Sequence, residues 1–336
     1  IKLIMKCLIT GGGGFLGRSL ANKLLSLGNV VTVLGRQSYP EIEKKINCIK
    51  ADVRNFSAVN VALRDQDVVF HTAATPGIWG DYKEFYETDV QGTQNIILAC
   101  HANKVKKLIY TSSPSVVFGE CDLEGIGEQT PYPEKYLCNY SKTKAIAEKM
   151  VMEVNGNKGL ATVCIRPHLI WGPGDPHLLP RIIKRAKNKK LFRVGEGKNL
   201  VDMIYIDNAV EAHIKACDKL SLNNNVAGKC YFVSDDNPVL LWDWIELVLK
   251  KLNLPGVSKS ISFKYAFVLG RILEFFYNVF HVKKEPLMTR FLATQLAKSH
   301  YFNIEQSKKD FDYKPIVSNE EGLKHLINDY YSRQED

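Results

Sequence analysis

Residues 6–17 read Lys-Cys-Leu-Ile-Thr-Gly-Gly-Gly-Gly-Phe-Leu-Gly, a short apolar segment that runs into a cluster of glycines. The apolar part predicts a strand, and the amphipathic pattern from Phe15 to Leu27 predicts a helix after it. Gly11, Gly14 and Gly17 have the spacing that gives a dinucleotide-binding loop its tight turn, its close approach to a pyrophosphate and its close helix packing. The free amides and positive dipole end of the helix would face the phosphates. This stretch therefore predicts a nucleotide site.

The first half of the chain alternates short apolar segments with amphipathic ones. Strands are predicted at 6–10, 30–34, 46–51, 68–72, 107–111 and 160–166, and helices at 15–27, 82–103 and 136–155. This alternation indicates an α/β fold with a doubly wound parallel sheet, which binds ligands at the carboxyl ends of its strands. Beyond Pro167 the alternation loosens into a basic helix, short strands near 201–206 and 229–233, and several helices. We therefore predict a dinucleotide-binding domain over 1–166 and a smaller substrate-binding lobe over most of 167–336, with some segments returning to the first domain.

The composition excludes several classes of protein. Contents of 45% hydrophobic and 24% charged residues are typical of a globular chain. The net charge of +9 suits an anionic partner such as nucleic acid, anionic lipid or an anionic cofactor. The basic residues are dispersed, and their densest run, 181–193, lacks interleaved aromatic residues, so no nucleic-acid partner is expected. The eight cysteines lack metal-binding spacing, so we expect reduced thiols and no metal. With neither a signal peptide nor an apolar span of about 20 residues, the chain is expected to be cytoplasmic.

The residues after the second predicted strand bear on the choice of cofactor. NAD enzymes usually carry Asp or Glu there, where it accepts a hydrogen bond from the ribose 2′-hydroxyl, whereas this chain has Gly35 and Arg36. An arginine suits a 2′-phosphate, so NADP is expected, and NAD is the alternative if Arg36 is only a solvated surface residue. His71, at the end of another predicted strand, is interpreted as a packed residue. The predicted cofactor site comprises Gly11, Gly14, Phe15, Leu16, Gly17, Arg36, Asp52, Val53, Ala73, Ala74, Tyr140, Lys144 and Pro167.

Three side chains form a candidate catalytic group. Tyr140 and Lys144 are four residues apart on a predicted helix, so both project from one face. A tyrosine with a pKa near 10 is a poor catalyst at neutral pH, and the lysine ammonium is expected to lower that pKa and to hold a nicotinamide ribose. Ser113, at the end of a predicted strand, would orient and polarise a substrate carbonyl. Together these residues predict hydride transfer at a carbon–oxygen centre.

With these motifs the chain resembles the extended short-chain dehydrogenases/reductases over essentially its whole length. Thr10–Gly17 matches the T-G-x-x-G-x-x-G motif, Tyr140–Lys144 matches Y-x-x-x-K, and Ser113 matches the active-site serine. Residues 111–118, 166–175 and 199–202 look most like the 3β-hydroxysteroid dehydrogenase branch. The resemblance implies a Rossmann domain and a homodimer formed through the helices near 82–103 and 136–155.

This chain departs from the family pattern at two positions. Members that act on nucleotide sugars usually carry Arg just before the aspartate that matches Asp202, where it contacts the diphosphate; here Val201 stands there. The family's N-V-x-G-T motif begins with Asp89 in this chain. The first departure argues against a sugar-nucleotide substrate, and the second concerns how the helix near Asp89 supports the site.

Residues 263–281 are strongly apolar. Their main interruptions are Lys264, Arg271, Glu274 and Asn278, which at about 100° per residue fall in one narrow sector of a helix. The wide apolar face would be buried against the lobe, line an acyl or sterol pocket, or lie in a bilayer interface as a peripheral membrane contact. Four aromatic residues are expected either near the nicotinamide or in the core: Trp79, Tyr82, Tyr86 and Trp171.

These features predict an NADP(H)-dependent oxidoreductase with a hydrophobic small-molecule substrate. The resemblance favours reduction of the 3-oxo group of a 2-alkyl-3-oxoalkanoate to the 3-hydroxy acid. The first alternative is a 3β-hydroxysteroid or sterol-4-carboxylate 3-dehydrogenase whose product decarboxylates. A nucleotide-sugar epimerase and a non-catalytic cofactor-binding scaffold are the further alternatives.

Overall fold

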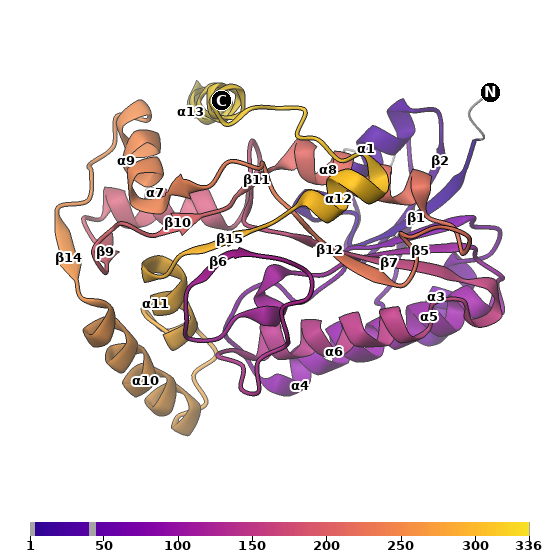
Figure 1. Cartoon of the computed structure of the whole chain (residues 1–336), viewed down its shortest axis with the longest axis horizontal. Coiled ribbons are helices and arrows are strands. Elements are labelled where there is room, and N and C mark those ends of the chain that lie inside the picture. Colours follow the sequence, from indigo (N-terminus) through magenta and orange to yellow (C-terminus); the bar gives the residue numbers. More distant parts are fainter. Residues whose placement is uncertain (1–3, 40–44, 336) are drawn as a thin grey trace.

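A computed structural model describes residues 4–39 and 45–335 of the chain. Within these residues the central sheet has seven strands, all parallel, in the order β3-β2-β1-β4-β5-β7-β12 (Figure 1). The doubly wound sheet predicted from the sequence is therefore confirmed. The strand bounds are β1 Lys6–Thr10, β2 Val30–Gly35, β3 Asn47–Lys50, β4 Val68–His71, β5 Lys107–Thr111, β7 Ala161–Pro167 and β12 Lys229–Val233.

The seventh strand comes from the second half of the chain. β12 pairs in parallel with β7, with Tyr231 opposite Ile165. The sequence predicts a short strand at this place within the loosely patterned region, because a run of five residues does not reveal its partner across a long connection. Helix α8 (Ile206–Lys219) also returns to the sheet, where it packs beside α1 (Phe15–Ser26). The division at residue 166 stays a prediction.

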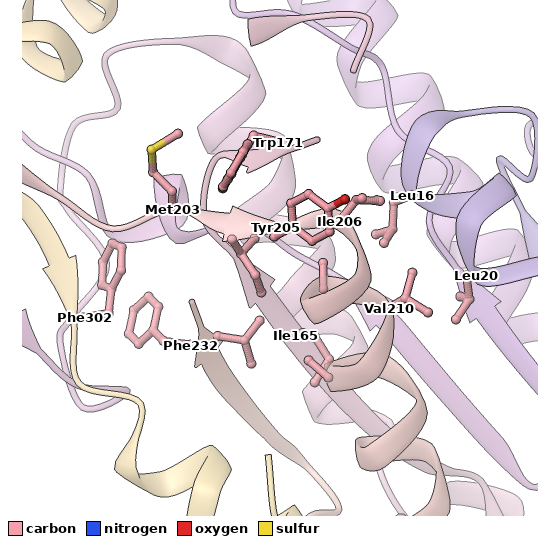
Figure 2. Packing of buried hydrophobic residues seen from close by; sticks show 14 of the residues in the cluster. Leu16, Leu20, Ile165, Trp171, Met203, Tyr205, Ile206, Val210, Phe232 and Phe302 are labelled. Carbon is pink, nitrogen blue, oxygen red and sulfur yellow. The ribbon is translucent and has the colours of Figure 1, made fainter. Parts of the chain in front are cut away.

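The two faces of the sheet bury two separate cores. Along β1, Cys7 and Ile9 point to the face covered by α1 and α8, and Leu8 points to the opposite face. Figure 2 shows the first core, in which side chains of α1, α8, β7 and the segment 171–206 interdigitate. The second core is covered by α3 (Phe56–Ala62), α5 (Gly92–Ala102) and α6 (Asn139–Glu153).

Most of the remaining elements gather beyond one end of the central sheet, on the left in Figure 1, whereas α12 packs against α8 and β12. Their short strands form separate sheets in the orders β13-β10-β15-β6, β11-β8 and β14-β9. The strands are β6 Leu123–Ile126, β8 Ile170–Trp171, β9 Phe192–Val194, β10 Leu200–Val201, β11 Ile204–Tyr205, β13 Val239–Leu240, β14 Lys259–Ile261 and β15 His300–Phe302. The helices are α7 Leu178–Lys187, α9 Leu241–Lys251, α10 Phe263–Val279, α11 Arg290–Ala297, α12 Glu305–Phe311 and α13 Asn319–Glu335.

The helix predicted at 82–103 is built from three pieces. α4 (Tyr82–Phe85) leads into a π-helical turn at Tyr86–Gln91, which continues as α5. Such insertions often occur at functional sites, and this one carries Asp89. α5 and α6 pack against each other (Figure 1). The homodimer expected through them stays a prediction.

The described residues contain neither a helix that could span a membrane nor a cluster of metal-binding side chains. None of their helices combines the length and the apolar character needed to cross a bilayer. They also contain no cluster of three or more His, Cys, Asp or Glu side chains that could hold a metal ion.

A buried ion pair attaches α6 to the sheet. Glu148 accepts from Arg166 Nε at 2.8 Å and from Arg166 Nη2 at 2.6 Å, and the two side chains are 0% and 1% exposed. The Tyr132 hydroxyl donates to the same carboxylate at 2.6 Å. Because α6 also carries Tyr140 and Lys144, this clamp sets their position over the sheet.

We predict that Glu148→Ala lowers the free energy of unfolding by about 3–5 kcal/mol, because it leaves the Arg166 guanidinium buried without a counter-charge. Urea unfolding monitored by circular dichroism measures the change. Glu320→Ala removes the carboxylate of an exposed ion pair with Lys324 and should change stability little. Equal effects of the two substitutions would show that the buried pair does not hold α6.

Candidate active site

The glycine loop leaves space that any side chain would fill. Gly11 has φ +67°, and a Cβ built on it would lie 2.8 Å from Cα of Ala73 at the end of β4. A Cβ on Gly17 would overlap the carbonyl oxygen of Gly11. Gly14 precedes α1 and places no side-chain cap over its first turn. The loop therefore presents bare backbone amides and a helix N-terminus, which suits a pyrophosphate.

The strand ends enclose one cavity of about 700 Å³ at the carboxyl edge of the sheet. It is lined by the glycine loop, the ends of β2, β4 and β5, and the start of α6. All the predicted catalytic and cofactor residues line this cavity, namely Gly11, Gly14, Phe15, Leu16, Gly17, Arg36, Asp52, Val53, Ala73, Ala74, Ser113, Tyr140, Lys144 and Pro167. The structure thus brings every predicted site residue together, while their roles stay predictions.

The end of the cavity near β2 fits the adenosine part of a dinucleotide. Arg36 is exposed there, directly after β2. Asp52 accepts from Arg54 Nε at 3.1 Å and from Arg54 Nη2 at 2.8 Å, and these bonds lower the pKa of Asp52. The ring of Tyr39, a residue that sequence analysis missed, lies against Gly13 and Gly35. This end thus combines an exposed guanidinium, a carboxylate and an aromatic ring beside the bare loop.

Lys144 is buried in the cavity wall. Its Nζ donates to the carbonyl oxygen of Thr111 at 2.5 Å and lies 4.1 Å from the ring centroid of Tyr110. Burial lowers the pKa of Lys144 to about 8, although the negative charges of Asp89 and Glu148 act in the opposite direction. The end of β5 therefore positions the ammonium, and the pKa of this group lies close to neutral pH.

Tyr140 and Ser113 face the same cavity from α6 and from the end of β5. Ser113 Oγ also accepts from the backbone N–H of Ser115 at 3.2 Å, which caps the short turn after β5. Burial raises the pKa of Tyr140, and the hydrogen bond with Ser113 opposes that rise. The sequence predicted that Lys144 lowers the pKa of Tyr140. The net shift of this pKa is upward instead, because desolvation of the phenolate dominates. Tyr140 is thus a neutral phenol, the form that can donate a proton.

Asp89 links the π-helical turn to α6. One carboxylate oxygen accepts from the backbone N–H of Thr75 at 2.9 Å, and the other accepts from Thr143 Oγ1 at 2.8 Å. Burial raises the pKa of Asp89, and the nearby Lys144 ammonium opposes this effect. Because Thr75 and Thr143 both donate, the Asp89 carboxylate accepts both hydrogen bonds at the position where the family motif has an asparagine amide. The departure noted in the sequence therefore places an acceptor and a negative charge next to Lys144.

The rest of the cavity wall is largely apolar. Side chains that sequence analysis did not assign to the site line it, namely Ile78, Leu169, Ile170, Leu178 and Phe291. Arg181 also lines the cavity but is paired with Glu285. His168 is hydrogen-bonded to His300 at 2.7 Å, and burial lowers the pKa of both, so this pair is uncharged at neutral pH. These residues come from distant segments, and no local motif signals them.

Several residues that the sequence pointed to lie outside the cavity lining. Val201 is completely buried in β10, outside the cavity lining. His71 is buried between the hydroxyls of Thr10 and Thr93, as a packed residue. The four candidate aromatic residues are not in the lining either. Trp171 packs in the core against Tyr205 and Trp244. The other three residues outside the lining are Trp79, Tyr82 and Tyr86.

Comparisons with known proteins add a family and a fold. The family model described as the 3-beta hydroxysteroid dehydrogenase/isomerase family matches residues 8–264. The 2-alkyl-3-oxoalkanoate reductase of Shewanella oneidensis is 43% identical over 326 residues, which cover 95% of this chain and 84% of that protein. The Stenotrophomonas maltophilia protein of the same name is 42% identical, covering 96% of this chain and 98% of that protein.

More distant relatives carry other names. The decarboxylating sterol-4-alpha-carboxylate 3-dehydrogenase of Mus musculus is 32% identical, covering 100% of this chain and 94% of that protein. Among solved structures, UDP-glucuronic acid 4-epimerase from Bacillus cereus in complex with NAD superposes with a TM-score of 0.76 at 22% identity, covering 99% of this chain and 100% of that one. At this identity the likeness concerns the fold alone.

We predict that Lys144 titrates near pH 8, well below the pKa of an ordinary lysine, because its ammonium is buried. NMR of lysine labelled with ¹³C at Cε gives the midpoint, and Lys144→Met identifies the signal. Asp89→Asn should move the midpoint lower still, since it removes a negative charge that favours the ammonium. An ordinary lysine midpoint, unaffected by Asp89→Asn, would contradict this electrostatic arrangement.

Proposed function

We propose that this chain, which belongs to the 3-beta hydroxysteroid dehydrogenase/isomerase family, reduces the 3-oxo group of a hydrophobic 2-alkyl-3-oxoalkanoate with NADPH. The chain is an oxidoreductase of the extended short-chain dehydrogenase/reductase type. The observation that carries the proposal is that one cavity is lined both by Ser113, Tyr140 and Lys144 and by a largely apolar wall. Two bacterial relatives named as such reductases support the same substrate class.

We assign the proton chemistry to three side chains. A bound nicotinamide supplies the hydride that adds to C3 of the substrate. Ser113 Oγ–H donates to the carbonyl oxygen and orients it. Tyr140 then gives its phenolic proton to that oxygen as negative charge develops, which its raised pKa permits because the phenol is neutral beforehand. Lys144, one helical turn away, supports the resulting phenolate with the ammonium that Thr111 O holds in place.

The preference for NADP rests on Arg36. This guanidinium is exposed at the edge of the cavity, and residues 35–39 contain no carboxylate to accept from a ribose 2′-hydroxyl. A 2′-phosphate would receive charge-assisted hydrogen bonds from Arg36. Asp52, the carboxylate nearby, is occupied by Arg54.

The apolar lining favours an acyl substrate over a nucleotide sugar. A sugar diphosphate needs cations, yet Arg181 is paired with Glu285, the His168–His300 pair is neutral, and Val201 is buried in the core. Leu169, Leu178 and Phe291 instead offer surface that gains about 25 cal/mol per Å² of apolar ligand area buried.

A sterol-4-carboxylate is the second candidate, because relatives with that name align along nearly the whole chain. The two substrates share one chemical feature, a carboxylate on the carbon next to the carbon that is reduced or oxidised. The same three catalytic groups serve both reactions, so the shape of the pocket beyond the reacting carbon decides between them.

We predict that NADPH binds about ten- to a hundredfold more tightly than NADH, and that Arg36→Ala removes most of this difference. Fluorescence titration of both cofactors gives the affinities. Arg64→Ala, an exposed change outside the cavity, serves as the control and should leave the ratio unaltered. Equal affinities in the unmodified protein would refute the NADP assignment.

For the substrate, we predict that kcat/KM rises with acyl length in a series of 2-alkyl-3-oxo acids, up to roughly fourfold per methylene until the pocket is full. Cofactor oxidation measures the rates. Leu178→Asn should flatten this dependence, whereas Leu222→Asn, exposed outside the cavity, should not.

Two results of that series would overturn the substrate assignment. Turnover of UDP- or GDP-sugars with no response to acyl length would refute an acyl substrate. Activity confined to 4-carboxysterols would select the second candidate.

A further inference from the structure

Helix α10 attaches to the protein through a narrow polar and small-residue stripe. Ala266, Gly270 and Glu274 are its buried positions, and a Cβ on Gly270 would lie 2.6 Å from the carbonyl carbon of Thr289. Glu274 accepts from the backbone N–H and from Nε of Arg290, each at 2.6 Å. The sequence pattern placed Glu274 with Lys264, Arg271 and Asn278 in one narrow sector of the helix. In the structure this carboxylate faces inward, because it anchors α10 to the start of α11.

Consequently, the apolar side of α10 faces outward. Tyr265, Phe275 and Phe280 are 73%, 63% and 69% exposed. Of the 23 exposed large hydrophobic side chains in the described residues, ten lie between 265 and 287. Those on or next to the helix recur every three or four positions and so form one stripe, namely Tyr265, Val268, Leu269, Ile272, Phe275, Phe276, Val279 and Phe280. Soluble monomers rarely expose a continuous apolar surface of this kind, so it marks an interaction site.

Basic residues border this apolar stripe. Lys264 and Arg271 lie on one flank of α10, and Lys283 and Lys284 follow its end, all of them exposed. Within 259–284 the acidic residue Glu274 is buried and bound to Arg290. A second copy of the chain would place these cations against one another, whereas the anionic head groups of a bilayer would complement them.

We propose that α10 and the adjoining residues 280–284 dock this protein on the surface of an anionic lipid bilayer. The helix lies flat on the membrane, with its phenylalanines among the acyl chains and its lysines at the phosphates. Its buried stripe keeps it attached to α11 in this position, at the molecular periphery (Figure 1).

The docking face is continuous with the active-site wall. The Trp79 indole N–H donates to the carbonyl oxygen of Val282 at 3.1 Å, and its ring meets Tyr277 edge-on at 6.0 Å. Ile78, the residue before Trp79, lines the cavity. Phe291 of α11 lines it too, and α11 packs against α10. Provided that the proposed function holds, this arrangement lets a long-chain substrate pass from the bilayer into the cavity.

Vesicle co-sedimentation tests the docking. The full chain should bind vesicles of phosphatidylcholine with 30% phosphatidylglycerol at least tenfold more tightly than pure phosphatidylcholine vesicles, because the lysines need anionic partners. The double variant Phe275→Ser/Phe280→Ser should lose at least tenfold in binding. Leu222→Ser/Ile316→Ser, which alters exposed apolar residues elsewhere, should bind normally. Thermal unfolding checks that both variants are folded.

Three outcomes would overturn the docking proposal. They are failure of the unmodified protein to bind anionic vesicles, undiminished binding by the Phe275/Phe280 variant, and a dimer that this variant dissociates without any vesicle binding. The last outcome would identify the face as a contact between copies.

Rate measurements separate this proposal from the proposed function. The Phe275/Phe280 variant should keep its rate on a short, water-soluble 3-oxo acid and lose at least severalfold on a long-chain one presented in vesicles. Equal rates of variant and unmodified protein on the vesicle substrate would refute delivery from the bilayer. Absence of turnover on every 3-oxo acid, with vesicle binding intact, would refute the proposed function and leave the docking in place.

Discussion

The buried ammonium of Lys144 is the constraint on which the site depends. A charge taken out of water costs several kcal/mol unless it is paired and hydrogen-bonded. Here the Thr111 carbonyl, the Tyr110 ring and the Asp89 carboxylate provide that compensation. The end of β5, the π-helical turn and α6 must therefore meet at one point. Tyr140, one turn earlier on α6, then lies at the sheet edge where the glycine loop also opens.

Charge is distributed unevenly along the cavity, and the proposed sites of cofactor and substrate follow this asymmetry. The end near β2 has an exposed cation at Arg36, whereas along the apolar wall Arg181 is paired with Glu285 and His168 is neutral. A phosphorylated ribose suits the first region and a hydrocarbon chain the second. The exposed face of α10 extends this apolar character from the cavity wall to the surface, through Trp79 and Val282.

Local patterns predicted the fold and the inner site, because they depend on spacing within single elements. The glycine loop and the pair Tyr140 and Lys144 are examples, and every predicted site residue lines one cavity. The sequence did not predict what depends on long-range pairing. β12 reveals its partner only in three dimensions, and Phe291 reaches the cavity from a distant helix. Periodicity likewise detected the apolar side of α10 but not its orientation, which Gly270 and Glu274 determine by close contact with Thr289 and Arg290.

A deuterium-transfer experiment tests the assignment of the catalytic group most directly. With NADPH carrying deuterium at the transferable C4 position and a 2-alkyl-3-oxo acid as substrate, we expect one deuterium at C3 of the 3-hydroxy acid, observed by mass spectrometry. Tyr140→Phe should slow its formation by about a hundredfold or more, because the proton donor is gone. A product without deuterium at C3, or an unchanged rate in Tyr140→Phe, would contradict the assignment of Ser113, Tyr140 and Lys144 as the catalytic group.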